Sequence, residues 1–258
     1  MLKWIPVLLI VGALCFLTVP AKLSRNIDFS KLGAREKAYL EPFEGKIIHT
    51  GFNRAPEIGN LIQSLGKDFH IEAAVETGTW KGETTRFLSS CFDEVHTIEI
   101  SDEHYKNAIE TLKDRPNVHL HLGSSEKVMH EILPALSSKR TIFYLDAHWN
   151  EYWPLLDELE EIGKTHKDNC IVVIDDFKVP HRRDISYDKY GRHKCSYEYI
   201  SKKLDQVFTD YDYYYLIPKD LTSRAKFVAI PKNWSKNQSS VCKAHFENPI
   251  NFLRGAYR

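Results

Sequence analysis

The amino-acid sequence predicts an α/β fold, a Rossmann-like doubly wound sheet that is mostly parallel and carries a terminal antiparallel strand. Five short apolar runs between residues 71 and 174 alternate with amphipathic segments. This alternation is typical of repeated strand–helix units, which form a parallel sheet covered on both faces. Two more apolar runs follow, joined by the polar segment PKDLTSRAK, and we interpret them as an antiparallel pair.

The same pattern gives each element a residue range. A leading helix is expected at Pro56–Leu65, where apolar residues recur at helical spacing. The expected strands are Ile71–Val75, Val95–Ile100, Val118–Leu122, Thr141–Leu145 and Cys170–Ile174, followed by the antiparallel pair Tyr213–Ile217 and Phe227–Ile230. The other helices are expected at Glu83–Ser90, Asp102–Lys113, Ser125–Leu136, Trp153–Lys164 and Tyr197–Val207.

The chain of 258 residues suits one α/β domain with a sizeable core, which we place at residues 55–231. Residues 22–54 are interpreted as a linker and leading helix, and residues 232–258 as a polar and aromatic tail. The 35 basic and 35 acidic residues balance, which argues against a nucleic-acid partner. A homo-oligomer is left open by these properties.

Residues 1–21 contain an almost wholly apolar run, Trp4–Val19. Its length is close to the shortest that crosses a bilayer, and we favour a signal anchor that tethers the protein to a membrane through residues 4–20. The side of the membrane stays open: basic residues after the run favour a cytosolic domain, whereas the sequons Asn233-Trp-Ser235 and Asn237-Gln-Ser239 matter only in a lumenal chain. The alternative is a cleaved signal peptide and a secreted or lumenal protein.

The segment VETGTWKGETT, at the end of the first expected strand, is a candidate ligand-binding loop. Gly78 and Gly82 bracket a turn from strand into helix, and the start of that helix offers free N–H groups. Glu76 and Thr77 stand at the strand end, where an acidic side chain is expected to meet a polar ligand. The alternative is an ordinary tight strand-to-helix turn.

Glu99 ends the second expected strand, twenty-one residues after Gly78. An acidic residue at this point can accept hydrogen bonds from both ribose hydroxyls of a nucleotide cofactor. The alternative is a solvated strand end. With the glycine loop in place, we expect a nucleotide cofactor along the first strand ends.

The pattern E-x-G-x-x-x-G-x-T, followed by an acidic end to the next strand, resembles the class I S-adenosylmethionine-dependent methyltransferases. The resemblance implies S-adenosylmethionine as cofactor, with Glu76 and Gly78 along its methionine part and Glu99 on its ribose. It also implies that Ser124 and Ser125, which follow the third strand, lie at the edge of the adenine.

Three carboxylates follow two neighbouring strands: Asp146 ends TIFYLD, and Asp175 and Asp176 end IVVIDD. Converging carboxylates repel one another unless a cation or protons intervene. Hard oxygen ligands suit Mg²⁺, and also Mn²⁺, so the set predicts a divalent metal site. The alternative is that Asp175 or Asp176 caps the following segment.

This acidic set resembles two groups of metal-dependent O-methyltransferases, the catechol type and the macrolide-sugar type. The resemblance implies methyl transfer to a hydroxyl of a small molecule or a sugar. Asp146 is then expected to contact the cofactor, to bind the metal and to take part in catalysis. The catechol-type lysine base is missing, and His148 is the natural substitute, unless it is a structural histidine. Trp149, Tyr152 and Trp153 either line the acceptor pocket or pack the next helix.

The segment Phe177–Tyr199 leaves the sheet beside the acidic pair and is rich in basic residues and tyrosine. A loop at this place can cover a substrate. Its basic side chains, Arg182, Arg183, Arg192 and Lys194, are either solvated or meet an anionic group of the acceptor.

Two other functions fit the same fold. A nicotinamide-dependent oxidoreductase predicts G-x-G-x-x-G, whereas the glycines here are four apart with Trp80 between them. Trp80 is also a departure from the methyltransferases, many of which carry glycine there. The second alternative is a non-catalytic, membrane-tethered binding module.

Overall fold

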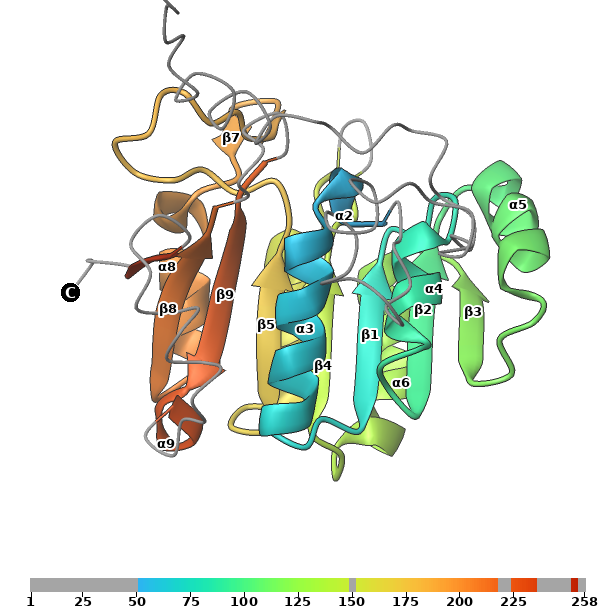
Figure 1. Cartoon of the computed structure of the whole chain (residues 1–258). Coiled ribbons are helices and arrows are strands. Elements are labelled where there is room, and N and C mark those ends of the chain that lie inside the picture. The colour runs from blue at the N-terminus through green and yellow to red at the C-terminus, as the bar shows by residue number, and fades with distance from the viewer. Residues whose placement is uncertain (1–50, 149–151, 218–223, 236–251, 255–258) are drawn as a thin grey trace, which may run out of the picture. The chain divides into compact units, whose positions relative to one another are not determined.

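The computed structural model describes residues 51–148, 152–217, 224–235 and 252–254, which belong to one compact unit beginning at Gly51. Its main sheet is built from β1 (Ala73–Thr77), β2 (Glu94–Glu99), β3 (Val118–Leu122), β4 (Thr141–Leu145), β5 (Cys170–Ile174), β8 (Tyr211–Leu216), β9 (Lys226–Pro231) and β10 (Phe252–Arg254). The strand order is β10-β8-β9-β5-β4-β1-β2-β3, and Figure 1 shows this order from β8 to β3.

The chain changes direction across the sheet at β1. Strands β1, β2 and β3 run outward to one edge, and β4 then returns to pair with β1 on its other side. These strands and β5 are mutually parallel, while β9 is antiparallel to β5 and to β8. The point where strand order reverses, between β1 and β4, is where open α/β sheets bind ligands.

Helices cover both faces of the sheet (Figure 1). One face packs against α2 (Gly51–Arg54), α3 (Pro56–Asp68) and α4 (Glu83–Leu88). The other face packs against α6 (Ser125–Leu136), α7 (Leu155–Thr165) and α8 (Tyr197–Val207). Helix α5 (Asp102–Leu112) lies beside β3, and α9 (Lys232–Ser235) follows β9. The central strands are buried on both sides, which explains the apolar sequences TIFYL and CIVVI.

The predicted fold class is confirmed, a mostly parallel sheet with alternating helices and antiparallel strands at one end. The ranges predicted for β3, β4, β5, α6 and α8 match the observed ones. Strand β1 begins two residues later than predicted and includes Glu76 and Thr77, because the chain stays extended through Thr77 to pair with β2 and β4. Helix α7 begins at Leu155, after Pro154 at its N-cap.

Three short strands were not predicted from the sequence. Strands β6 (Lys189–Tyr190) and β7 (His193–Lys194) form a separate antiparallel hairpin around Gly191 within the basic segment. Strand β10, in the tail, pairs with β8. Each has two or three residues, too few to give a recognisable hydrophobic period.

The prediction of a membrane-anchored protein needs correction. Across the described ranges, no helix is both long and apolar enough to cross a bilayer. The run Trp4–Val19, on which that prediction depended, lies outside the described residues, as does the sequon at Asn237. The domain limits 55–231 stay a prediction.

Helices α7 and α8 cross at Gly163, and this contact generates a stability prediction. A Cβ atom at Gly163 would lie 2.4 Å from Val207 Cβ. We expect Gly163→Ala to lower the free energy of unfolding by about 1–3 kcal/mol through overpacking, although alanine is the better helix former. Urea denaturation measures this change. The swap Gly163→Ala with Val207→Gly should cost less than the sum of the two single substitutions, and strict additivity would contradict the predicted contact.

Candidate active site

The carboxyl ends of β1, β2, β4 and β5 bring most of the predicted site residues to one edge of the sheet. Figure 1 shows these ends at the same side, with α4 and α5 starting beside them. Parallel strands place their final residues together, so side chains far apart in sequence meet there. The edge has two parts, a loop after β1 and an acidic cluster after β4 and β5.

The loop after β1 requires glycine at two points. Gly78 has φ +83°, and a Cβ there would lie 2.9 Å from the carbonyl oxygen of Asp146. Gly82 has φ +74° and precedes helix α4 directly. Trp80, between them, also has a positive φ, +48°, a conformation that glycine adopts without steric cost. Trp80 is thus left-handed like the glycines on either side of it, and its indole ring is half exposed at 53%.

Glu99 fixes this loop through its carboxylate. Its Oε2 accepts the backbone N–H of Trp80 at 2.8 Å, and its Oε1 accepts that of Ser101 at 2.9 Å. Each carboxylate oxygen can accept more than one hydrogen bond, so capacity remains for two hydroxyl donors. Glu99 is 5% exposed, and it is held in place before any ligand binds.

Glu76 points to the α3–α4 face and is buried in a network of hydroxyls. Thr97 donates to its Oε2 at 2.7 Å, and the Thr85 hydroxyl of α4 donates to the same oxygen. Thr79 extends the network to Thr97 at 2.7 Å. Burial raises the pKa of Glu76 to about 7, although the hydrogen bonds from Thr85 and Thr97 oppose the shift. A carboxyl group that is 2% exposed therefore titrates near neutral pH.

Thr77, Ser124 and Ser125 occupy the opposite face. The Thr77 hydroxyl accepts the backbone N–H groups of Asp146 and Ala147, at 3.3 and 3.4 Å, and so joins β1 to the end of β4. Ser124 donates to Glu126 at 2.8 Å. The Ser125 hydroxyl is buried and makes no hydrogen bond within the described residues.

The carboxylates of Asp146, Asp175 and Asp176 converge as predicted. One oxygen from each lies within 4.8 Å of the others. Two cations that the sequence analysis missed face them from the start of β9. Lys226 forms a fully buried ion pair with Asp175 and lies 3.8 Å from Asp176, and Arg224 pairs with Asp176.

The three acids have different environments. Asp175 is fully engaged, because Lys226 binds its Oδ1 and Tyr144 donates to its Oδ2 at 2.5 Å. Burial alone would raise the pKa of Asp175, but Lys226 and these hydrogen bonds hold it below its usual value. Burial and the charge of Asp175 raise the pKa values of Asp146 and Asp176.

Asp176 carries a buried oxygen, Oδ1, that no described group hydrogen-bonds. Its φ of +53° turns the chain out of the sheet directly after β5. A carboxylate oxygen without a hydrogen bond, beside a second acid and 3.8 Å from the Lys226 ammonium, still suits a hard divalent cation. Asp146 has no ion pair among the described residues, and Asp176 pairs with Arg224 through Oδ2 but keeps Oδ1 without a hydrogen bond, so these two acids have more free ligand capacity than Asp175.

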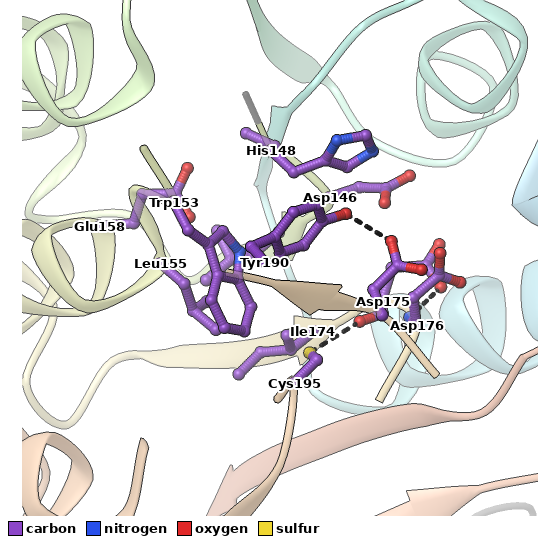
Figure 2. A pocket seen from close by; sticks show the side chains of 13 residues that line it. Asp146, His148, Trp153, Leu155, Glu158, Ile174, Asp175, Asp176, Tyr190 and Cys195 are labelled. Carbon is purple, nitrogen blue, oxygen red and sulfur yellow. Dashed lines mark hydrogen bonds between the residues drawn. The ribbon is translucent and has the colours of Figure 1, made fainter. Parts of the chain in front are cut away.

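A pocket opens beside the acids (Figure 2). His148 stacks on Tyr190 with ring centroids 5.0 Å apart, and both lie near Asp146 in Figure 2. Tyr190 donates to Asp188, which also pairs with Arg224. The basic segment therefore brings Asp188 and Tyr190 to the pocket, whereas its Arg182 pairs with Asp184 on the surface.

Glu158 is a further pocket residue that the sequence analysis missed. It lies on α7, and Figure 2 shows it near Trp153, away from the acidic cluster. Both carboxylate oxygens are buried and make no hydrogen bond with the described residues. Burial raises its pKa to about 7, against the effect of the nearby Ser125 and Thr77 hydroxyls.

The missed residues gave only weak sequence signals. Arg224 and Lys226 lie in the polar segment PKDLTSRAK, which we interpreted as a loop between strands. Lys226 is in fact the first residue of β9, and β9 pairs with β5 so that Phe227 is opposite Ile174. A basic residue at the start of an apolar strand, antiparallel to a strand that ends in Asp-Asp, is the signal that could have found it.

Comparisons with known proteins agree with this geometry. Residues 75–177 match a family model described as a methyltransferase domain. Among solved structures, an O-methyltransferase from Bacillus cereus in complex with SAH is 13% identical, with TM-score 0.53, and the match covers 78% of this chain and 92% of that chain. The O-methyltransferase TomG from Streptomyces achromogenes, which is involved in tomaymycin synthesis and was solved with SAM, is 15% identical, with TM-score 0.50 and coverage of 86% and 94%.

At these identities the two structures establish the fold alone. A search of curated proteins finds no match. The family match begins in β1 and ends just after Asp176, so it spans both the glycine loop and the acidic cluster.

The raised pKa of Glu76 predicts how stability depends on pH. Because its pKa is higher in the folded than in the unfolded chain, its favourable contribution is present below about pH 4.5 and is lost as pH rises through about 7. Glu76→Gln cannot ionise, so we expect it to gain about 2 kcal/mol relative to the wild type between pH 5 and pH 8. Urea unfolding at both pH values measures the gain. Glu103→Gln, at an exposed carboxyl, is the matched control; an equal gain in both variants would contradict the assignment.

The buried ion pair predicts a non-additive mutant cycle. Lys226→Met leaves Asp175 without its cation, and we expect a loss of about 3–5 kcal/mol in the free energy of unfolding. Adding Asp175→Asn should restore most of it, because the remaining buried charge is then removed. Lys113→Met, at an exposed lysine paired with Glu110, should cost less than about 1 kcal/mol. Additive losses in the double variant would refute the coupling.

Proposed function

Since the chain is a class I S-adenosylmethionine-dependent methyltransferase, we propose that it methylates a hydroxyl group of a small molecule with help from a divalent metal. The observation that carries this proposal is the contact between Gly78 and Asp146. It joins the cofactor loop directly to the acidic cluster, so a methyl donor in the loop and an acceptor at the acids would be neighbours. The two alternative functions, an oxidoreductase and a non-catalytic binding module, are less favoured because the matching family model is a methyltransferase domain.

Several residues support the cofactor assignment. Glu99 lies ready to accept two hydroxyl donors, as a ribose offers, while Gly78 lets the backbone at Asp146 lie close to the loop. Glu76 and Thr77 stiffen the two faces of the same strand end. We assign the adenine to the start of α6, where Ser125 has a buried hydroxyl near Glu158 and Ser124 is the N-cap residue.

We assign the metal to Asp146 and Asp176, with Asp175 behind them. The four carboxylates at this edge, those three and Asp188, face only Arg224 and Lys226 within the described residues, so the ionised cluster retains negative charge. A bound Mg²⁺ or Mn²⁺ would lower the pKa of an acceptor hydroxyl and orient it. Lys226 is itself unsuited to act as the base, because neighbouring carboxylates raise its pKa against the effect of burial.

The chemical step is an in-line displacement. The acceptor oxygen forms a bond to the methyl carbon while the carbon–sulfur bond breaks. The electron pair of the broken carbon–sulfur bond stays on sulfur. The acceptor proton passes to a base, for which His148 is the candidate because it lines the pocket beside Asp146. Asp146 itself is the alternative base. Holding donor and acceptor in line supplies most of the rate enhancement.

The metal assignment suggests the class of acceptor. His148, Tyr190 and Trp153 line the pocket and pack on one another, with Tyr190 and Trp153 centroids 5.2 Å apart. Catechol-like diols and sugar diols both offer two adjacent hydroxyls to a single metal ion. The acceptor is therefore a vicinal diol in this proposal.

Methyl transfer from labelled S-adenosylmethionine to catechols and sugar diols tests the proposal. We expect activity that needs Mg²⁺ or Mn²⁺ and falls at least about 100-fold on chelation and in Asp176→Asn. Glu99→Gln should weaken cofactor binding with little change in metal dependence. Asp114→Asn, which alters an exposed ion pair with Arg86, is the matched control and should keep wild-type activity. Full activity with chelator and in Asp176→Asn would refute metal assistance, and no transfer to any diol would refute the acceptor class.

A further inference from the structure

A cluster of imidazole and carboxylate groups lies on the sheet away from the acidic site. Glu94 and His96 belong to β2, while His119 and His121 belong to β3. Alternation along a strand places residues two apart on the same face, and the register sets His96 opposite His119 and His121 opposite Ile98. All four side chains therefore share one face at the edge of the sheet.

The spacing of the polar atoms in this cluster suits a metal ion. One ligand atom from each of Glu94, His96 and His119 lies within 4.8 Å of the other two. Glu94 Oε1 and His96 Nε2 are 2.9 Å apart. Ligand atoms around a tetrahedral zinc ion, with bonds of about 2.0–2.1 Å, are about 3.3 Å apart. Small side-chain shifts would bring the three groups to that geometry.

The residues that contact these three side chains also suit a metal site. The other nitrogen of His96, Nδ1, lies 3.0 Å from His121 Nε2, so a hydrogen bond can fix the ring with Nε2 towards Glu94. Ligand histidines in metal sites usually have their second nitrogen held in this way. Lys139 binds the remaining oxygen of Glu94 and limits its rotation. The rings of His119 and His121 stack on His96 at 4.7 and 5.2 Å.

The exposure and the ligand types of this cluster are suited to a bound metal ion. His96 is buried, Glu94 is half-buried and His119 is exposed, so the cluster has one open side. Two imidazoles and one carboxylate leave a fourth position for water or a small ligand. Imidazole prefers zinc and other late first-row ions to magnesium.

We propose that Glu94, His96 and His119 form a second metal site, selective for Zn²⁺-like ions, that ties the edge strand β3 to β2. This site is separate in place and in ligand type from the acidic cluster after β4 and β5. Because β3 is the last strand of the sheet, an ion bridging it to β2 stabilises the edge that leads into the cofactor residues Glu99 and Ser124.

The test is calorimetric titration of the full, tag-free chain with Zn²⁺ in excess Mg²⁺, together with Co²⁺ absorption and thermal unfolding. We expect about one Zn²⁺ per chain, visible Co²⁺ bands of a nitrogen-rich site, and a melting temperature about 5 °C higher with Zn²⁺. His119→Ala and His96→Asn should each abolish all three signals. Asp176→Asn should retain them, which separates this site from the acidic cluster.

His130→Ala is the matched control, since His130 is an exposed histidine paired with one glutamate, Glu161, at 3.1 Å. It should bind Zn²⁺ as the wild type does. The proposal is overturned if zinc binding survives both His119→Ala and His96→Asn, if it disappears in Asp176→Asn, or if the wild type binds none. Because His119 is exposed, its substitution can be made without removing a buried side chain, and circular dichroism verifies that the variant is folded.

Discussion

The burial of charge at the ends of β4, β5 and β9 is the constraint on which the candidate active site depends. Asp175 is held inside the protein because Lys226, fully buried on the neighbouring strand, supplies the opposite charge, and because Tyr144 donates to it. Of its neighbours, Asp176 pairs with Arg224 through Oδ2 and keeps Oδ1 without a hydrogen bond, while Asp146 has no ion pair among the described residues. The antiparallel strand β9 is thus more than an edge of the sheet, since it delivers the lysine that permits three carboxylates to converge.

The half of the site that we propose for the cofactor follows from strand alternation. Adjacent residues at the end of β1 face opposite sides, so Glu76 enters the hydroxyl network under α4, while Thr77 binds the backbone after β4. Glu99 links this strand end to the glycine loop through the N–H of Trp80. The loop is therefore held from three directions, which would reduce the conformational entropy that the proposed cofactor binding has to overcome. Trp80 has a left-handed backbone although it is not a glycine.

The chain has zero net charge, and the structure pairs or clusters the charged residues of the basic segment and the histidine cluster. The segment after β5 contributes Asp188 and Tyr190 to the pocket, while its Arg182 pairs on the surface. The histidines of β2 and β3 lie together because of the register in which the two strands pair. Neither EVH in β2 nor HLH in β3 is a recognised motif by itself. Pairing of the strands brings these short patterns to a common face.

The sequence by itself determined the order of the main strands and helices along the chain, because that order depends on local hydrophobic period. It also predicted the convergence of Asp146, Asp175 and Asp176, because parallel strands share one carboxyl edge. The tertiary structure alone decided which of the three acids are paired with cations. That outcome depends on Lys226 and Arg224, which come from a distant antiparallel strand and the residues before it, and which resemble loop residues in the linear sequence. The difference arises because hydrophobic period is a local property, whereas the compensation of a buried charge is a property of the whole packed neighbourhood.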